Sequence, residues 1–349
     1  MKLLTVCIPC YNSIMEMHKA INSCLLMKDE VEVLIVDRHS HDETLQVARE
    51  YEEAYPDTVK VITTKEDVPF LKTALKYSEG LYFKILQCFD YLDQPSLVSV
   101  VETIRDFIRI QANLDVLLTD YKYVVPQKKE KRVSYKNIFP TETIFEWHNI
   151  KAFHKHFQID LGSVIIKTST LRKIKTDEEN IFYNELTVYG IIPYIKSMYY
   201  LNVPFHCYGS HRKIHISKSN SYIDLMKSLW DLYDVYSLKS RRQRTYVIEY
   251  LSKVYVLTVY LLLKSNQKEQ IELLNAYLGF NDPKLYKALT KREILKVHIL
   301  ETAMLDTRDT CNYVAERLGA EPVQAIGNKF IIYRKSDEEK YRKIELPRK

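Results

Sequence analysis

Short apolar runs alternate with amphipathic stretches through the first part of the chain. Apolar residues dominate 3–8 and 31–36, and polar residues follow each run. Between the two runs, 13–27 has the apolar spacing of a helix. Apolar runs of this length are typical of strands buried on both faces of a parallel sheet. The pattern therefore predicts a β-α-β unit at the start of the chain.

The same alternation continues beyond this unit. It predicts helices near 45–55, 70–77 and 96–112, the last with Pro95 beside its first turn, and strands near 59–63, 81–86, 114–120 and 163–167. Alternating strands and helices indicate an α/β fold with a doubly wound sheet. We expect the basic stretch 128–132 to be a solvated turn.

The pattern changes twice toward the end of the chain. From 219 to about 287 it is helical throughout, with apolar residues three and four apart. Such a stripe indicates packed helices, and a face on a membrane surface is the alternative. The last part predicts a small α/β unit, with a strand at 295–300, a helix at 307–318 and a hairpin of 321–326 with 329–333. We expect three parts, at 1–218, 219–288 and 289–349.

Composition narrows the class of protein. With 349 residues, 46% of them hydrophobic, the chain can bury a large core, and a net charge of +6 suits phosphate ligands or an anionic membrane without requiring either. Six scattered cysteines and the lack of a signal-peptide layout predict a reduced, cytoplasmic protein. The longest apolar run, 254–263, is shorter than the ~20 residues of a spanning helix, so we expect no transmembrane segment.

Polar residues follow the first two predicted strands. In open α/β sheets ligands bind at the carboxyl ends of strands, so this edge is the candidate site. The residues placed there are Pro9, Tyr11, Asn12, Asp37, Arg38 and Ser40. Other signals are weaker. Cys7 and Cys10 have the spacing of a redox motif but lie on a strand. His148, His154 and His156 lack a specific zinc-site spacing, and the sequence contains no glycine-rich phosphate loop.

Four stretches together carry a resemblance to a known family. They are 8–12 (Ile-Pro-Cys-Tyr-Asn), 36–44, 78–86 and 90–93. In order and spacing they resemble the inverting GT-A glycosyltransferases of family 2, in the branch common in Firmicutes, over about 3–288. The resemblance implies a GT-A, Rossmann-like fold for transfer from nucleotide-diphospho-sugars. It also implies a UDP-sugar donor, a saccharide or lipid-linked acceptor, and a role in cell-envelope or exopolysaccharide synthesis, with peripheral contact at the inner membrane face.

The resemblance also implies a nucleotide clamp at the sheet edge. Tyr11 would cover the base, Asn12 and Ser40 would form hydrogen bonds, and Asp37 keeps one of the family's two aspartates. Arg38 replaces the other aspartate, although a guanidinium can only donate hydrogen bonds. Arg212 matches an arginine of the family's mobile C-terminal loop and would offset the charge of the departing diphosphate.

The reacting positions depart from the family pattern. The Asp-x-Asp group that binds Mg²⁺ or Mn²⁺ falls on Gln87-Cys88-Phe89, so the usual ligands are missing and Asp90 is the surviving candidate. Asp90 and Asp93 are either a metal pair or helix-capping residues. The catalytic aspartate aligns with Asn184, which cannot accept a proton, so an active enzyme would use Glu185 as the base.

The C-terminal residues resemble a second family. The matching stretches are 295–300, 320–327, 333–334 and 343–347, and they resemble the CRM domain, an RNA-binding module, over about 289–349. The family's glycine-rich RNA loop has no counterpart beyond Gly279. Three hypotheses result: a sugar transferase, a catalytically silent scaffold with the same fold, and RNA binding through 289–349.

Overall fold

The structure is a computed structural model. It describes residues 1–64, 70–124, 127, 129–150, 158–174, 183–209, 219–291, 320–326, 329–335 and 341–347. Residues 183–186, 219, 220, 264, 291 and those after 319 are described by their backbone alone. The chain divides into two compact units, Met1–Lys213 and Ile214–Lys349.

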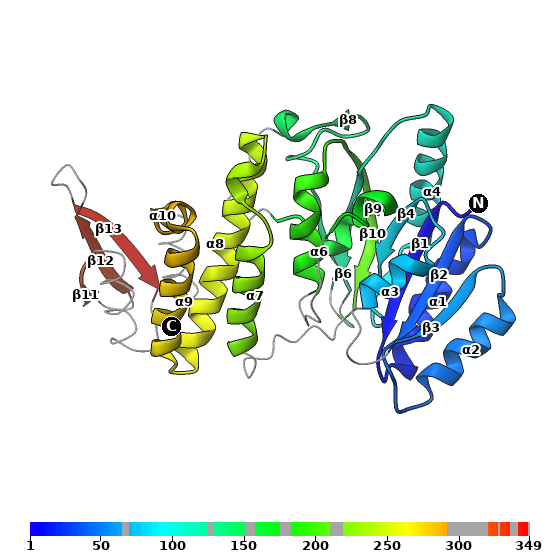
Figure 1. The fold of residues 1–349 in the computed structure, drawn as a ribbon, viewed down its shortest axis with the longest axis horizontal. Helices are drawn as coiled ribbons and strands as arrows, with labels where there is room; N and C mark the ends of the chain where they lie inside the picture. Colours follow the sequence, from blue (N-terminus) through cyan, green and yellow to red (C-terminus); the bar gives the residue numbers. More distant parts are fainter. Residues whose placement is uncertain are drawn as a thin grey trace. The chain divides into compact units, whose positions relative to one another are not determined.

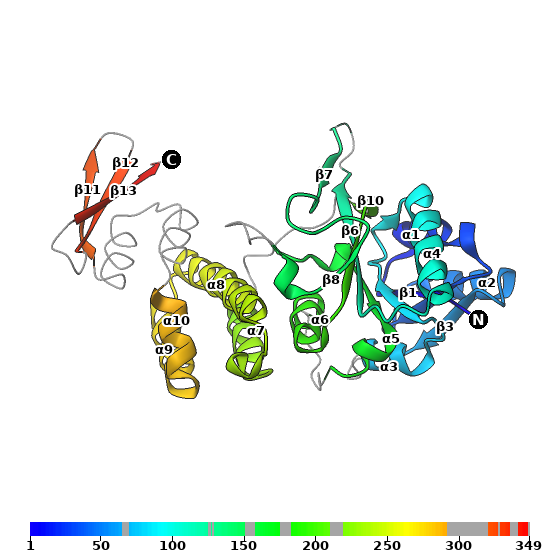
Figure 2. The same cartoon turned by 90° about the horizontal axis from the view of Figure 1, so that it is seen from above.

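The first unit is built on a mixed, ten-stranded sheet with helices on both faces (Figures 1 and 2). The strand order is β3-β2-β1-β4-β9-β6-β10-β5, with β7 beside β6 and β8 beside β10. The strands are β1 (Leu4–Cys10), β2 (Val31–Asp37), β3 (Val59–Thr63), β4 (Tyr82–Ile85), β5 (Tyr91–Leu92), β6 (Val116–Tyr123), β7 (Lys131–Val133), β8 (Ile144–Phe145), β9 (Val164–Lys167) and β10 (Met198–Tyr208).

The helices of this unit cover the sheet. They are α1 (Ile14–Cys24), α2 (Thr44–Ala54), α3 (Phe70–Tyr77), α4 (Gln94–Arg109), α5 (Thr168–Leu171) and α6 (Tyr183–Ile191), with the 3-10 helix η3 at Leu161–Ser163. Helix α1 packs against α4 on one face, and α3 and α5 lie over the other face (Figure 2).

Strand direction brings four carboxyl ends to one edge. Strands β1, β2, β3 and β4 are parallel, and every residue of β1 and β2 is buried, as the apolar runs predict. Strand β9 is antiparallel to both β4 and β6, and β10 is parallel to β6. The carboxyl ends of β6 and β10 therefore lie at the same edge as those of β1, β2 and β4.

A close approach of β1 to the turn before β4 requires glycine. A Cβ on Gly80 would lie 2.3 Å from the backbone nitrogen of Thr5. Instead the Gly80 N–H donates to Thr5 Oγ1 at 2.9 Å, and the Thr5 hydroxyl donates to buried Glu32. The small residue thus lets two central strands meet with their polar groups satisfied.

The second unit contains helices and a small sheet. Its helices are α7 (Ser219–Asp231), α8 (Arg241–Lys264), α9 (Lys268–Asn281) and α10 (Pro283–Lys291), and its antiparallel strands are β11 (Ala320–Ile326), β12 (Lys329–Lys335) and β13 (Tyr341–Pro347). In the described part, one stretch, Arg241–Leu263, has the length and composition to cross a membrane, but 72% of its most apolar window is buried within the protein. A buried core helix meets the same criteria.

Most predicted elements are confirmed, and several differ. The hairpin of β11 and β12 is confirmed, whereas the strand at 295–300 and the helix at 307–318 lie outside the described residues. The solvated turn at 128–132 is wrong in part, because β7 begins at Lys131 and pairs with β6. Arg132 there contacts Asp120, whose side chain is 0% exposed, so a buried carboxylate orders this arginine. Helix α6 was not predicted.

Candidate functional site

The loops after β1 and β2 are joined by hydrogen bonds at the shared edge. The Arg38 N–H donates to the Cys10 carbonyl at 2.9 Å. The Asn12 N–H donates to Ser40 Oγ at 3.1 Å, and Asn12 Oδ1 accepts from the His41 N–H at 2.9 Å. Asn12 adopts φ 48°, a left-handed conformation that asparagine tolerates better than most residues. The two predicted halves of the clamp therefore form one connected surface.

Asp37 has an unsatisfied oxygen within this surface. Its side chain is 1% exposed, and Oδ2 accepts from the Ser40 N–H at 3.2 Å. Oδ1 is also buried and has no hydrogen-bond partner among the described residues. Burying a carboxylate oxygen without a donor is unfavourable, so Asp37 is short of one hydrogen bond among the described residues, although the atoms around Oδ1 cover it.

Aromatic rings form the exposed rim beside Asp37. Tyr11 is 49% exposed, and its ring centroid lies 6.5 Å from that of His41. The His39 and His41 rings are 5.4 Å apart. Arg38 is partly buried next to them, while Pro9 is buried within β1 and shapes the strand end rather than the surface. The rim offers flat apolar faces for a ring-shaped ligand.

Asp90, after β4, forms a buried pair with β10. Asp90 Oδ2 lies 3.0 Å from His206 Nε2, and Oδ1 accepts from the Gly209 N–H at 2.9 Å. Burial and then the Lys84 ammonium lower the pKa of His206, although Asp90 acts against this shift. A neutral imidazole therefore donates from Nε2 to the carboxylate, and its buried Nδ1 lacks a partner among the described residues.

The described residues do not fit the divalent cation that the family resemblance implies. They contain no group of three or more His, Cys, Asp or Glu side chains placed to hold a metal. Both oxygens of Asp90 already have partners, and Asp93 caps α4 by accepting from the Ser96 N–H at 3.2 Å. Phe89 is partly buried against the core and offers no ligand atom. The capping alternative is thus confirmed for Asp93.

Two predicted catalytic residues open a helix. Asn184 and Glu185 lie in the first turn of α6, and their side chains are outside the described part of the structure. Arg212, His154 and His156 also lie outside the described residues. The structure brings together the predicted residues at the ends of β1 and β2, and it places Asp90 at the end of β4 on the same edge.

Sequence reasoning missed a buried lysine below this edge. Lys84, on β4, is 0% exposed, and its Nζ donates to the carbonyls of Leu161 at 2.9 Å, Gly162 at 2.8 Å and Val164 at 3.3 Å. Burial lowers the pKa of Lys84 to about 7, against the raising effect of Asp160 and Asp90. A lysine inside the apolar run 81–86 is the signal that could have identified it.

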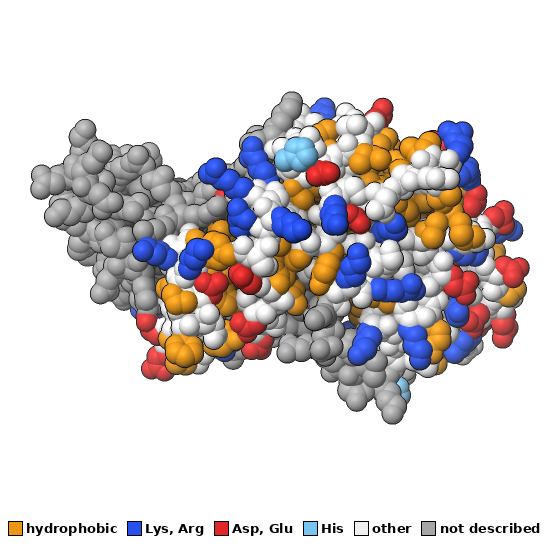
Figure 3. All heavy atoms as spheres, turned by 45° about the horizontal axis from the view of Figure 1, so that its top comes forward, with side chains coloured by type: hydrophobic (Ala, Val, Ile, Leu, Met, Phe, Trp, Pro, Cys, Tyr) orange, Lys and Arg blue, Asp and Glu red, His pale blue; other side chains and the backbone are white. Residues whose placement is uncertain are grey.

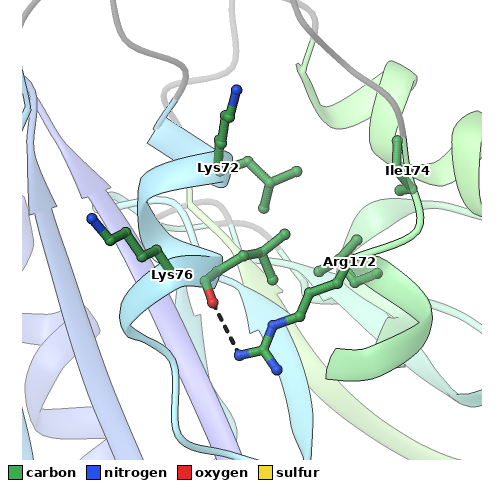
Figure 4. A pocket seen from close by; sticks show the side chains of 7 residues that line it. Lys72, Lys76, Arg172 and Ile174 are labelled. Carbon is green, nitrogen blue, oxygen red and sulfur yellow. Dashed lines mark hydrogen bonds between the residues drawn. The ribbon is translucent and has the colours of Figure 1, made fainter.

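A separate hollow lies between α3 and the residues that follow α5 (Figure 4). Its volume is about 310 Å³, and it is lined by Leu71, Lys72, Leu75, Lys76, Leu171, Arg172 and Ile174. Arg172 donates to the Leu75 carbonyl at 3.0 Å. Helix α5 follows the end of β9 that pairs with the start of β4, so the hollow lies away from the clamp. Among the residues whose side chains are described, no predicted site residue lines it.

Basic side chains are dispersed rather than gathered. On the face shown in Figure 3, Lys and Arg side chains are spread over the surface, with acidic side chains among them and toward its ends. The basic side chains of this face therefore do not single out a site on it.

Comparison with known proteins identifies two families. The model of Glycosyl transferase family 2 matches residues 5–86, and the model of the CRS1 / YhbY (CRM) domain matches residues 283–334. The curated "Probable RNA-binding protein YqeI" of Bacillus subtilis (strain 168) is 35% identical over 72 residues, which are 20% of this chain and 73% of that protein. The match to the CRM domain model begins at residue 283, which is the first residue of α10.

Solved structures share the GT-A fold. S. aureus TarS 1–349 in complex with UDP-GlcNAc has a TM-score of 0.61 and 18% identity, over 98% of this chain and 99% of that one. TarS 1–349 in complex with UDP gives a TM-score of 0.61 and 17% identity, over 98% of both chains. At this identity the likeness establishes the GT-A fold. The chain therefore belongs to the CRS1 / YhbY (CRM) family through the domain at 283–334, and its residues 5–86 match the model of Glycosyl transferase family 2 within a GT-A fold.

Proposed function

We propose that the chain transfers a sugar from a UDP-sugar bound at the carboxyl edge of the first unit's sheet. The acceptor is a saccharide or a lipid-linked saccharide, and the reaction serves cell-envelope or exopolysaccharide synthesis at the cytoplasmic face of the membrane. The family match to residues 5–86 and a fold shared with a protein crystallised with UDP-GlcNAc support this proposal.

The observation that carries the proposal is the unpartnered Oδ1 of Asp37. Uracil presents an N–H donor on its ring edge, and ribose presents hydroxyls, so either group would satisfy this buried acceptor. Tyr11, 49% exposed at the end of β1, offers a ring face for the base. Pro9, Asn12 and Ser40 fix the shape of this clamp.

The departing diphosphate needs positive charge. Because the described residues do not fit a Mg²⁺ or Mn²⁺ ion, we assign this task to the guanidinium groups of Arg38 and Arg212. Deprotonation of the acceptor hydroxyl needs a carboxylate, which Glu185 supplies and Asn184 does not. In this scheme Asp90 holds no metal. Its two oxygens bind His206 and the Gly209 N–H, so it fixes the end of β10 against the end of β4.

Calorimetric titration with UDP and UDP-GlcNAc, with and without manganese, tests the proposal. The wild type should bind both, and Asp37→Asn should weaken binding at least about tenfold, because the loss of a hydrogen bond to a charged group costs about 1.5–3 kcal/mol. The amide would keep its oxygen on the Ser40 N–H and turn its NH₂ toward the ligand's donor. Asp57→Asn, an exposed acid in the same unit, is the matched control. No binding in any mixture would refute the proposal.

A catalytically silent scaffold is the second candidate. The exchange of reacting positions for Asn184 and Phe89 favours it. It predicts no hydrolysis of UDP-GlcNAc or UDP-glucose, whereas a transferase predicts turnover that Glu185→Gln abolishes. Chromatographic measurement of released UDP separates the two.

RNA contact through the C-terminal domain is a further candidate, and the match to residues 283–334 favours it. Structured RNA should be retained by the full chain and released between about 50 and 200 mM salt, because phosphate contacts are salt-sensitive. A chain ending at residue 291 should lose this retention. Equal retention by the two chains would rule this candidate out.

A further inference from the structure

Lys84 has a fully buried amino group that contacts three backbone carbonyls. The acceptors belong to Leu161, Gly162 and Val164, at 2.9, 2.8 and 3.3 Å from Nζ. An ammonium has three N–H donors, so each finds an acceptor. Leaving a charge inside a protein without such partners is strongly unfavourable. The lysine therefore attaches η3 and the start of β9 to the centre of β4.

Two carboxylates adjoin this group, Asp160 partly buried and Asp90 buried. Asp160 Oδ1 accepts from the Gly162 N–H at 2.8 Å and from the Tyr208 hydroxyl. Asp90 pairs with His206 at 3.0 Å. The cluster thus joins β4, η3 and the carboxyl end of β10 with charges of both signs.

The segment attached by Lys84 supports the predicted catalytic helix. Helix α6 packs against η3, and η3 also packs against β6 and β10. Asn184 and Glu185 lie in the first turn of α6. The clamp at Asp37 lies instead on β2, separated from β4 by β1 in the sheet. Displacing η3 would therefore move the helix of the base without moving the nucleotide clamp.

We propose that Lys84 is a positioning residue, which fixes α6 and its Glu185 relative to the sheet edge by holding η3 against β4. The inference rests on the proposed transferase function. It assigns Lys84 to the proton-accepting side of the reaction and not to nucleotide binding. A displacement of about 1 Å in a reacting group costs on the order of a hundredfold in rate.

The kinetic test compares Lys84→Met with Lys167→Met, a lysine of neighbouring β9 whose ammonium donates to Asn113 at the surface. UDP release from UDP-GlcNAc gives kcat, and calorimetry gives the affinity for UDP. Lys84→Met should lower kcat at least about tenfold while the affinity for UDP stays within about twofold. The control should match the wild type in both. Parallel losses of kcat and UDP affinity, or an unchanged kcat, would overturn the proposal.

A second variant and a second measurement keep the proposal testable if Lys84→Met does not fold or the wild type has no activity. Tyr208→Phe removes the hydroxyl that contacts Asp160 and Gly162 but keeps the ring, so it should fold and lower kcat in the same selective way. Hydrogen exchange at the amides of 187–191 should be faster in Lys84→Met than in the wild type. If the wild type neither binds UDP nor turns over, the transferase proposal fails, and exchange alone decides whether Lys84 anchors α6. Unchanged exchange at 187–191 would refute the anchoring.

Discussion

At the residue scale, buried polar side chains distinguish this molecule from a plain α/β sheet. Lys84, Asp120 and His206 are each at most 2% exposed, and each has hydrogen-bond partners from distant parts of the chain. Such groups are tolerated only when partners satisfy them, so removing a partner costs more than removing an exposed contact. Two predictions belong at this scale.

Arg132→Met should destabilise the first unit. Asp120 accepts from Arg132 Nε at 2.8 Å and from the Tyr200 hydroxyl at 2.5 Å. Without the guanidinium, a buried carboxylate loses its cation, and because Arg132 is 44% exposed we expect a loss of about 1–3 kcal/mol. Urea unfolding measures this loss. Lys131→Met, beside it on exposed β7, is the control, and equal stabilities of the two variants would contradict the prediction.

The Lys84 amine should make stability depend on pH. Burial lowers its pKa to about 7 from 10.5, so between these values the unfolded chain holds a proton that the folded chain has released. Stability from this group therefore rises with pH across that window, by at most about 1.4 kcal/mol per unit. A neutral amine still keeps two N–H donors for the carbonyls.

The measurement is the difference in unfolding free energy between the wild type and Lys84→Met at pH 6.5, 7.5 and 8.5. The difference should move in favour of the wild type as pH rises. Buried thiols act in the opposite direction above pH 9, since burial raises the pKa of Cys24 to about 12. A pH-independent difference would show that Lys84 stays charged throughout.

At the element scale, the candidate site depends on how helices begin and how strands end. Helix α4 begins after the capping aspartate Asp93, with Pro95 in its first turn, and its apolar face covers the sheet. The loops after β1 and β2 depend on left-handed residues, with His39 at φ 62°. These local features convert strand ends into a surface for a ligand.

Asp93→Ala should destabilise the protein by about 1 kcal/mol, because it removes the cap of α4. The carboxylate accepts from the Ser96 N–H at 3.2 Å and the Ser96 hydroxyl at 2.6 Å. Asp106→Ala is the matched control, since Asp106 lies in the same helix with its side chain 62% exposed. Thermal unfolding followed by circular dichroism should show a lower Tm for Asp93→Ala alone.

At the scale of the whole molecule, the parallel strands bring distant residues to one edge. Residues that follow β1, β2 and β4 meet there, and β10 contributes His206 and Gly209. The same edge brings no cluster of three metal-ligating side chains together among the described residues. The proposed transferase scheme therefore uses arginine side chains in place of a divalent cation.

Removal of divalent cations should leave UDP binding unchanged. The physical reason is that both Asp90 oxygens are already used by His206 and Gly209. Calorimetric titration of UDP in EDTA and in manganese should give affinities that agree within about twofold. An affinity at least about tenfold higher with manganese would contradict this and would point to ligands outside the described residues.

The predictable part of the fold is the part that local sequence controls. The strands at 4–10 and 31–37 follow from apolar runs, because a strand buried on both faces needs apolar residues throughout, and the half-buried edge strand at 59–63 follows from alternating residues. Helix α6 was missed since its residues lack a clear amphipathic period. Strand β7 was missed because its charged residues look solvated until Asp120 is placed beside Arg132.

The sequence alone determined the resemblance to two families, the order of most elements and the strand ends where Tyr11, Asp37 and Asp90 lie, since these depend on local pattern and motif. Only the tertiary structure decided which polar atoms are satisfied. In the folded chain, both oxygens of Asp90 bind groups at the end of β10. Oδ1 of Asp37 has no described partner, and the Lys84 amine is buried against η3. Hydrogen bonding joins residues far apart in the chain, so no local pattern contains it.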